Sequence, residues 1–152
     1  MINENNNKNE IIIGEKKDGI DYVTRTGVYG VTFNKVGQVA IFKTQYGYFL
    51  PGGGLENEES KEECLMREFK EELGCDILID KFIGKASKYY YSDVFNHYRH
   101  PIGFFFIVVI KNESIESIEE DKTLHWMYAQ DCLRLLHEHQ AWAVLEATKY
   151  IN

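Results

Sequence analysis

Apolar residues along this chain gather in short runs, and turn-forming residues separate the runs. Runs of β-branched and aromatic residues with the length of strands occur at residues 28–33, 39–42, 47–50, 77–83, 86–91, 102–110 and 123–128. The first two runs flank Asn34-Lys-Val-Gly37, which predicts a hairpin. The run at 47–50 ends at Pro51-Gly-Gly-Gly54, which is expected to break regular structure there.

One segment carries the signals of a helix with defined ends. Ser60 and Glu63 have the spacing of a capping box, and Gly74 stands where a left-handed residue would end the helix. We therefore predict a helix from Lys61 to Leu73. On a helical wheel its apolar residues form one arc that is expected to face the core: Leu65, Met66, Phe69 and Leu73.

The order of strands and helices predicts the fold class. A second helical segment follows the last strand, from Asp131 to Tyr150, and a break in it is expected near residues 137–140. Strands before and after a central helix favour an α/β or α+β sandwich with helices on both faces. We expect residues 11–152 to form this single domain. Residues 1–10 are rich in Asn and charge and are expected to be a disordered tail.

Composition and charge narrow the classes of function. The 152 residues suit one domain, and 17 Lys and Arg against 24 Asp and Glu give a net charge of −7. Such an acidic chain is not expected to bind nucleic acid stably, because that binding depends on basic residues that release counterions. The longest apolar run, Ile102–Ile110, is far shorter than the ~20 residues of a membrane-spanning helix, so no membrane partner is expected. No signal-like start is present, and three widely spaced cysteines suggest reduced thiols in the cytoplasm: Cys64, Cys75 and Cys132.

The predicted helix carries three carboxylates on one side. Glu68, Glu71 and Glu72 share an arc of about 100° beside the apolar arc. Like charges at this spacing repel, so a purely structural helix gains nothing from them unless a cation lies between them. A solvated acidic face is one interpretation, and a site for a hard cation is the other. A backbone carbonyl from Pro51–Gly54 could complete such a site, and these oxygen ligands suit Mg²⁺ or Mn²⁺.

These residues match a known signature, the Nudix box. Its seven fixed positions are all present between residues 53 and 75: Gly53, Glu59, Arg67, Glu68, Glu71, Glu72 and Gly74. With each residue type at a background frequency of about 7%, a chance match is on the order of one in a million. The chain thus resembles the Nudix (MutT-like) hydrolase superfamily. Cys75 is a departure, because the family usually places an aliphatic residue there, and a buried thiol is a fair substitute.

The resemblance implies a fold and an activity. The fold is the Nudix-type α/β/α sandwich, with a mixed β-sheet between helices. The activity is hydrolysis of a nucleoside diphosphate linked to another group, by attack of water on phosphorus, with Mg²⁺ or Mn²⁺. The implied substrate is a small nucleotide derivative, and the implied assembly is a monomer or a homodimer. Two alternatives stay open: a non-catalytic domain that binds a nucleotide metabolite, and an RNA 5′-end pyrophosphohydrolase.

The resemblance also implies roles for the residues of the box. Glu68 and Glu72 would be the principal metal ligands, and Glu71 would bind the metal or orient the attacking water. The carbonyl of Gly52 would complete the ligand set. Structural support of these carboxylates would come from Arg67, Glu59 and Gly53.

Outside the box the sequence offers single candidates. Family members often add a carboxylate from a loop before a late strand, and Glu120 is the expected catalytic residue of that kind, with a solvated acidic turn as the alternative. Arg25 and Lys43 lie at strand ends that could border the box and meet a phosphate. Tyr90 belongs to an aromatic-rich segment and could stack on a base. Each of these three also has an ordinary interpretation, as a surface charge or a strand residue.

Overall fold

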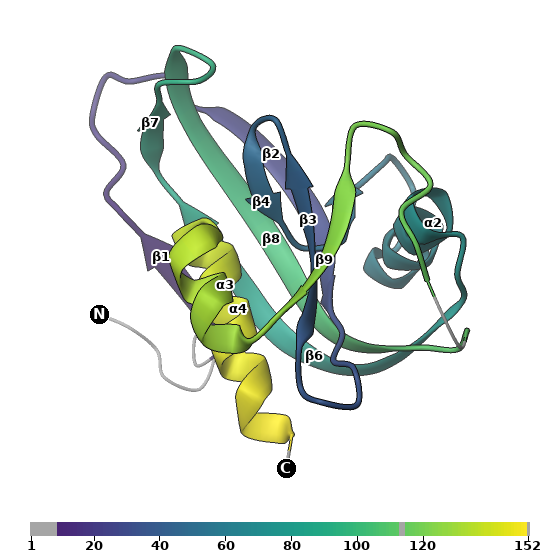
Figure 1. Cartoon of the computed structure of the whole chain (residues 1–152). Coiled ribbons are helices and arrows are strands. Elements are labelled where there is room, and N and C mark those ends of the chain that lie inside the picture. The colour runs from purple at the N-terminus through teal and green to yellow at the C-terminus, as the bar shows by residue number, and fades with distance from the viewer. Residues whose placement is uncertain (1–8, 113–114, 152) are drawn as a thin grey trace.

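The strands of this protein form two β-sheets, with helices on either side of the larger one (Figure 1). The computed structural model describes residues 9–112 and 115–151. Within these residues the strands are β1 (Glu10–Ile13), β2 (Val23–Val31), β3 (Val39–Thr44), β4 (Gly47–Phe49), β5 (Gly52–Gly54), β6 (Ile77–Lys88), β7 (Tyr90–Ser92), β8 (His97–Ile110) and β9 (Thr123–Met127). The helices are α2 (Lys61–Leu73), α3 (Ala129–Leu135) and α4 (Glu138–Ala147), and a 3₁₀ turn, η1 (Thr148–Tyr150), follows.

The larger sheet is mixed and has six strands. Its order is β1-β6-β8-β2-β5, and β7 pairs with β8. Strands β2 and β8 run parallel over nine paired residues, whereas β6 is antiparallel to β8 and β5 is antiparallel to β2. The smaller sheet has the order β4-β3-β9. This arrangement places β5, which carries Gly53 of the box, at one edge of the larger sheet, next to β2.

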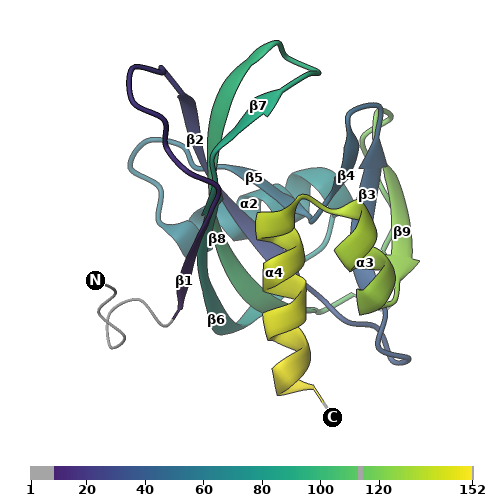
Figure 2. The ribbon, with the colours of Figure 1, turned by 90° about the vertical axis from the view of Figure 1, so that its left-hand side faces the viewer.

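Two hydrophobic clusters lie on opposite faces of the larger sheet. Phe105 packs into the cluster that α4 covers, and its neighbour Phe106 packs into the cluster that α2 covers. The same alternation places Val31 and Val28 of β2 in different clusters, because successive side chains of a strand point to opposite faces. Figure 2 shows α2 behind the sheet and α4 in front of it. The predicted α/β/α sandwich is therefore confirmed.

Helix α2 begins and ends where the sequence predicts. The hydroxyl of Ser60 accepts a hydrogen bond from the backbone N–H of Glu63 at 3.0 Å, and the Glu63 carboxylate accepts one from the N–H of Ser60 at 2.9 Å. Gly74 adopts the left-handed conformation with φ 63°, and its N–H donates to the carbonyl of Lys70. The caps fix the helix ends and so determine which residues face β5. The break in the C-terminal helical segment is also confirmed, at Leu136 and His137 between α3 and α4.

The predicted hairpin forms only at its turn. The N–H of Asn34 donates to the carbonyl of Gln38 at 2.9 Å, and Phe33 forms an isolated bridge with Val39. Beyond that bridge the two strands separate, because β2 pairs with β5 and β8 while β3 pairs with β4 and β9. The hairpin prediction was therefore wrong beyond the turn: the strands belong to different sheets.

Three other expectations from the pattern were wrong in detail. The runs at 77–83 and 86–91 form one long strand, β6, with register shifts near Gly84, and Tyr90 begins β7. The segment at 51–54 contains strand β5, because its glycines can approach β2 closely enough to pair with it. The tail was expected to reach residue 10, but Glu10 pairs with Lys85 of β6. Residues 1–8 lie outside the described residues.

Candidate functional site

Three carboxylates of α2 lie beside β5, and they differ in exposure. The side chain of Glu72 is 1% exposed, that of Glu68 is 14% exposed and that of Glu71 is 54% exposed. A Cβ at Gly53 would lie 2.6 Å from the carboxylate of Glu68, so only glycine leaves room for this close approach. The helix register and the glycine strand together place Glu68 and Glu72 at one edge of the sheet, and Arg67 links Glu71 to Glu68.

The most buried of these carboxylates, Glu72, has two partners. Its Oε1 accepts a hydrogen bond from the N–H of Gly52 at 2.8 Å, and its Oε2 accepts one from Nζ of Lys122 at 2.5 Å. Burial raises the pKa of Glu72 to about 7, although both partners lower it. A further cation at this carboxylate would favour the ionised form, so the site has affinity for positive charge.

Arg67 ties the carboxylates to the loop before the helix. Its Nε and Nη2 donate to the two oxygens of Glu59 at 2.7 and 3.0 Å, which is a bidentate pair. Its Nη1 lies 3.0 Å from Glu68 and 3.3 Å from Glu71, and Nη2 donates to the carbonyl of Gly54 at 3.1 Å. The hydrogen bond from Arg67 lowers the pKa of Glu59 to about 2. These contacts connect Arg67 to the carboxylates, and the support role of Arg67 and Glu59 stays a prediction.

The carboxylates of α2 offer oxygen donors to a divalent cation. Among residues 9–112 and 115–151, no three acidic, His or Cys side chains converge as ready-made ligands of one ion. Arg67 contacts Glu68 and Glu71, and Lys122 contacts Glu72, so two cationic side chains separate the carboxylates. The carboxylates nevertheless outnumber these cations, and oxygen donors suit a hard cation such as Mg²⁺ or Mn²⁺. The residues present fit such an ion, provided that the side chains of Arg67 or Lys122 give way.

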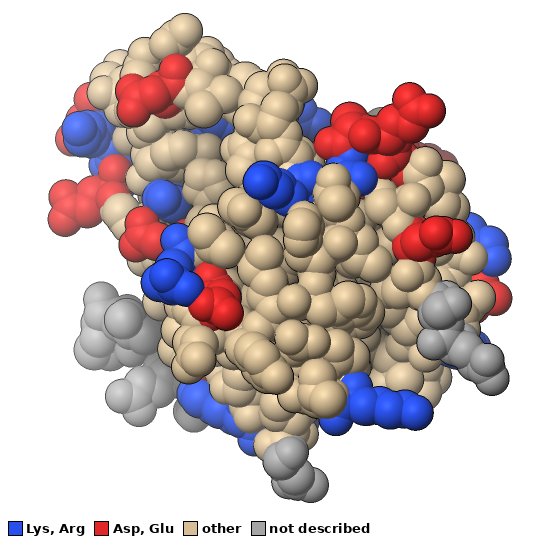
Figure 3. Space-filling view, viewed as in Figure 1, with Lys and Arg blue, Asp and Glu red and all other residues tan. Residues whose placement is uncertain are grey.

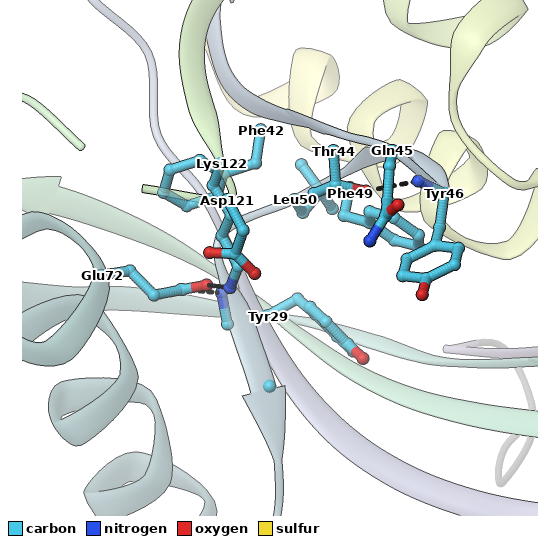
Figure 4. A pocket seen from close by; sticks show the side chains of 12 residues that line it. Tyr29, Phe42, Thr44, Gln45, Tyr46, Phe49, Leu50, Glu72, Asp121 and Lys122 are labelled. Carbon is cyan, nitrogen blue, oxygen red and sulfur yellow. Dashed lines mark hydrogen bonds and ion pairs between the residues drawn. The ribbon is translucent and has the colours of Figure 1, made fainter. Parts of the chain in front are cut away.

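A cavity of about 520 Å³, called the first cavity below, opens beside Glu72 (Figure 4). Tyr29, Phe42 and Phe49 supply aromatic walls, and Lys122 lies next to Glu72 at the polar end. Burial, with the nearby negative charges of Glu68 and Glu72, raises the pKa of Tyr29 to about 12, so its hydroxyl stays neutral. The first cavity can therefore hold a flat, apolar ring next to Glu72.

The loop before β9 contributes two residues to the first cavity. Glu120 is exposed and does not line the first cavity, whereas its neighbours Asp121 and Lys122 do. Lys122 is a residue of the candidate site that sequence reasoning missed, because no spacing rule relates this loop to Glu72, fifty residues away. Figure 3 shows acidic side chains gathered around a basic one at the upper right, where this loop lies near α2.

Of the three predicted substrate-binding residues, two line the same cavity and the third does not. Arg25 and Tyr90 line a second cavity of about 530 Å³, which also borders Gly54 of β5. Lys43 lines neither of these two cavities, and its Nζ lies 5.8 Å from the ring centroid of Tyr48. The structure thus places Arg25 and Tyr90 near the box and leaves Lys43 exposed on β3.

His139 lines the second cavity, and its burial predicts that the stability of the protein depends on pH. Burial, aided by nearby positive charge, lowers the pKa of His139 from 6.5 to about 3. The folded protein therefore binds this proton less readily than the unfolded chain, and stability falls as the pH drops below 6.5. We expect the wild type to lose about 1 kcal/mol more than His139→Gln between pH 7.5 and pH 5.5. Urea unfolding of both proteins at both pH values measures this, and equal losses would contradict it.

Comparisons with known proteins agree with this geometry. The sequence matches the family model of the NUDIX domain over residues 23–147. No curated protein matches the chain by sequence. None of the helices in the described part of the chain has the length and hydrophobicity that crossing a bilayer requires.

Several solved structures share the fold. The MutT protein from Methanosarcina mazei Go1 is 17% identical with a TM-score of 0.64, and the match covers 86% of this chain and 97% of that chain. The MutT NUDIX hydrolase from Burkholderia pseudomallei is 20% identical with a TM-score of 0.64, covering 81% and 97%. The C. elegans Ap4A hydrolase, in a binary complex, is 12% identical with a TM-score of 0.60, covering 84% and 96%. The match to the family model extends over most of the chain, and this protein therefore belongs to the NUDIX domain family, the family of the Nudix hydrolases.

Proposed function

We propose that this protein hydrolyses a nucleoside diphosphate linked to another group, with a small nucleotide derivative as substrate and Mg²⁺ or Mn²⁺ as cofactor. The observation that carries the proposal is that Glu72 lines an aromatic cavity, while Glu68 and Glu71 lie on the same helix and share contacts with Arg67. A nucleotide offers what this arrangement requires: a flat ring for the cavity and a phosphate chain for a cation bound to the carboxylates. The family membership and the Ap4A hydrolase among the similar structures support it.

The proposed ligand set follows the positions of the carboxylates. Glu68 and Glu72 would be the principal metal ligands, Glu71 would be a further ligand or would orient water, and the carbonyl of Gly52 would complete the set. The ion would neutralise phosphate charge and lower the pKa of a bound water. The N–H of Gly52 holds Oε1 of Glu72, so this carboxylate is oriented before any ligand arrives. Arg67 does the same for Glu68 and Glu71.

Glu71 is the proposed acceptor of the proton from the attacking water. Its side chain is more exposed than those of Glu68 and Glu72, so water reaches it, and Arg67 holds it within the cluster. Glu120, on the loop before β9, stays a second candidate for a catalytic carboxylate. The aromatic walls of the first cavity would exclude water from the side of the substrate opposite the carboxylates.

A substrate panel tests the proposed function. The purified protein is incubated with Mg²⁺ or Mn²⁺ and with nucleoside triphosphates, nucleotide sugars, ADP-ribose, dinucleoside polyphosphates, and capped or triphosphorylated RNA. We expect release of a nucleoside monophosphate or of phosphate from at least one small nucleotide derivative. No turnover of any compound, with nucleotide binding still present, would support the non-catalytic alternative. Turnover of RNA alone would support the RNA 5′-end alternative.

Two neighbouring glycines give a matched test of the carboxylate geometry. Gly53→Ala is expected to lower turnover at least about tenfold, because the new Cβ would displace the carboxylate of Glu68. Gly54→Ala adds the same methyl group where no atom lies within 4 Å, and we expect turnover within about twofold of wild type. Steady-state kinetics on the best substrate of the panel measure both. Equal activity of the two variants would show that the position of Glu68 does not matter for the reaction.

A further inference from the structure

The two cavities beside β5 form the two halves of one cleft. Tyr29, Tyr46 and Phe49 line both of them. The ring of Tyr29 lies over Gly27, where a Cβ would come within 2.6 Å of the tyrosine hydroxyl, so the glycine makes room for this dividing side chain. The first half reaches Glu72 and the second half reaches β2, β7 and β8. A ligand that extends past Tyr29 would therefore contact both halves.

The second half carries two arginines on one face of the sheet. In the parallel pairing of β2 with β8, Val23 lies opposite Arg99 and Arg25 lies opposite Pro101. Residues two apart on a strand share a face, so Arg25 and Arg99 project from adjacent strands to the same side, and both line the cavity. Two guanidinium groups placed in this way repel each other unless an anion lies between them.

The described residues do not supply that anion. Within residues 9–112 and 115–151, Arg25 and Arg99 form no ion pair, although the net charge of the chain is −7. The other two arginines are both paired, Arg67 with Glu59 and Arg134 with Asp131.

The charges around the two arginines leave this half of the cleft positive. The one carboxylate among the described residues that line the second cavity is Asp93, which is exposed. Lys88, also in the lining, is already paired with Glu138 at 3.2 Å. The guanidinium of Arg99 lies 4.5 Å from the ring centroid of Phe95, so the ring positions it while its N–H groups stay available to a ligand.

A second, independent observation points to a ligand in this half. His139 is 4% exposed and lines the same cavity, and its Nδ1 has no hydrogen-bond partner among the described residues. A buried polar atom without a partner is uncommon in folded proteins and often marks the place of a missing water or ligand group. The second half therefore combines cationic donors, aromatic walls and a buried group that lacks a partner.

We propose that Arg25 and Arg99 bind an oxyanion, a phosphate or a carboxylate, carried by the part of the substrate farthest from the cleaved diphosphate. This rests on the proposed function. Guanidinium groups bind such planar or tetrahedral oxyanions with two parallel hydrogen bonds. The acidic half of the cleft requires a metal ion to hold phosphates, whereas the arginine half holds an anion directly. The preferred substrates are thus nucleotide derivatives with an additional anionic group beyond the diphosphate.

Binding of a simple anion tests the arginine pair without any catalysis. Inorganic pyrophosphate is titrated into the full-length protein in excess EDTA, and the arginine Nε–Hε signals are followed by NMR. We expect two arginine signals to shift together, and Arg25→Gln or Arg99→Gln to weaken binding at least about tenfold, which is about 1.4 kcal/mol. Lys111→Gln removes one positive charge from an exposed residue at the end of β8, outside the cleft, and is expected to change binding less than twofold. The proposal would be overturned if these signals did not shift at 50 mM pyrophosphate, a concentration on the order of a weak Kd. It would also be overturned if Lys111→Gln weakened pyrophosphate binding as much as the two arginine variants.

Matched substrates test the same residues during turnover. Dephospho-coenzyme A and coenzyme A differ by one phosphate, and UDP-glucose and UDP-glucuronate differ by one carboxylate. We expect the anionic member of at least one pair to have a kcat/KM at least about tenfold higher. Arg25→Gln and Arg99→Gln are expected to lower kcat/KM more for the anionic member than for the neutral member, and so to remove that preference. The pair that shows the preference identifies phosphate or carboxylate. Hydrolysis without any preference would overturn the arginine site alone. Failure to hydrolyse any panel compound would overturn the proposed function. The pyrophosphate titration would in that case still show whether Arg25 and Arg99 bind an anion.

Discussion

Replacing Glu72 by Gln is expected to lower turnover at least about 100-fold, the scale of losing one preorganised electrostatic partner. The amide oxygen of the substituted side chain could still accept the hydrogen bond from Gly52, so the strand position is kept. The amide nitrogen, however, cannot ligate a hard cation and would face the ammonium group of Lys122, donor against donor. Steady-state kinetics with Mg²⁺, together with Mn²⁺ titration followed by electron paramagnetic resonance, measure the effect on rate and on metal binding separately.

Glu62 offers a control on the same helix. It lies in the first turn of α2, is exposed and has the same side chain, so Glu62→Gln removes one negative charge without touching the cluster. We expect its turnover and Mn²⁺ affinity to stay within about twofold of wild type. Near-wild-type turnover of Glu72→Gln would reject the assignment of Glu72 as a metal ligand. Thermal melting of both variants shows whether a loss of activity follows from unfolding.

Arg67→Ala is expected to reduce both stability and activity. Arg67 joins Glu59, Glu68 and Glu71 to the carbonyl of Gly54, so its removal leaves several acceptors without their common donor. We expect the melting temperature to fall by about 5 °C and turnover to fall at least about tenfold. Arg67→Lys keeps the charge but loses the bidentate contact with Glu59, and we expect an intermediate result.

Arg134 is the matched control for this change. Its side chain is mostly exposed and its ion pair is with Asp131 of the same helix, so Arg134→Ala is expected to shift the melting temperature by less than about 2 °C and to leave turnover unchanged. Differential scanning calorimetry and kinetics on the four proteins provide the comparison. If Arg67→Ala lost activity at an unchanged melting temperature, Arg67 would act on the reaction directly and the support role would be rejected.

The sequence by itself determined those features of the protein that depend on residues close together in the chain. The ends of α2 depend on Ser60, Glu63 and Gly74, which lie within or next to the helix, so the capping rules predict them from the sequence. The shared arc of Glu68, Glu71 and Glu72 follows from the helical repeat alone. The break between α3 and α4 was likewise predicted from the sequence around His137.

The tertiary structure alone decided which distant segments meet. The sequence pattern of a strand does not identify the strand with which it pairs. That β2 pairs with β5 and β8, and not along its length with β3, therefore could not be predicted. For the same reason Lys122 was missed as the partner of Glu72, and nothing local relates Arg25 to Arg99. Periodicity and caps act over a few residues, whereas sheet pairing and cavity walls depend on side chains tens of residues apart. The residues of the box therefore lie in one segment and can be recognised from the sequence, whereas the cleft beside them forms only when the whole chain has folded.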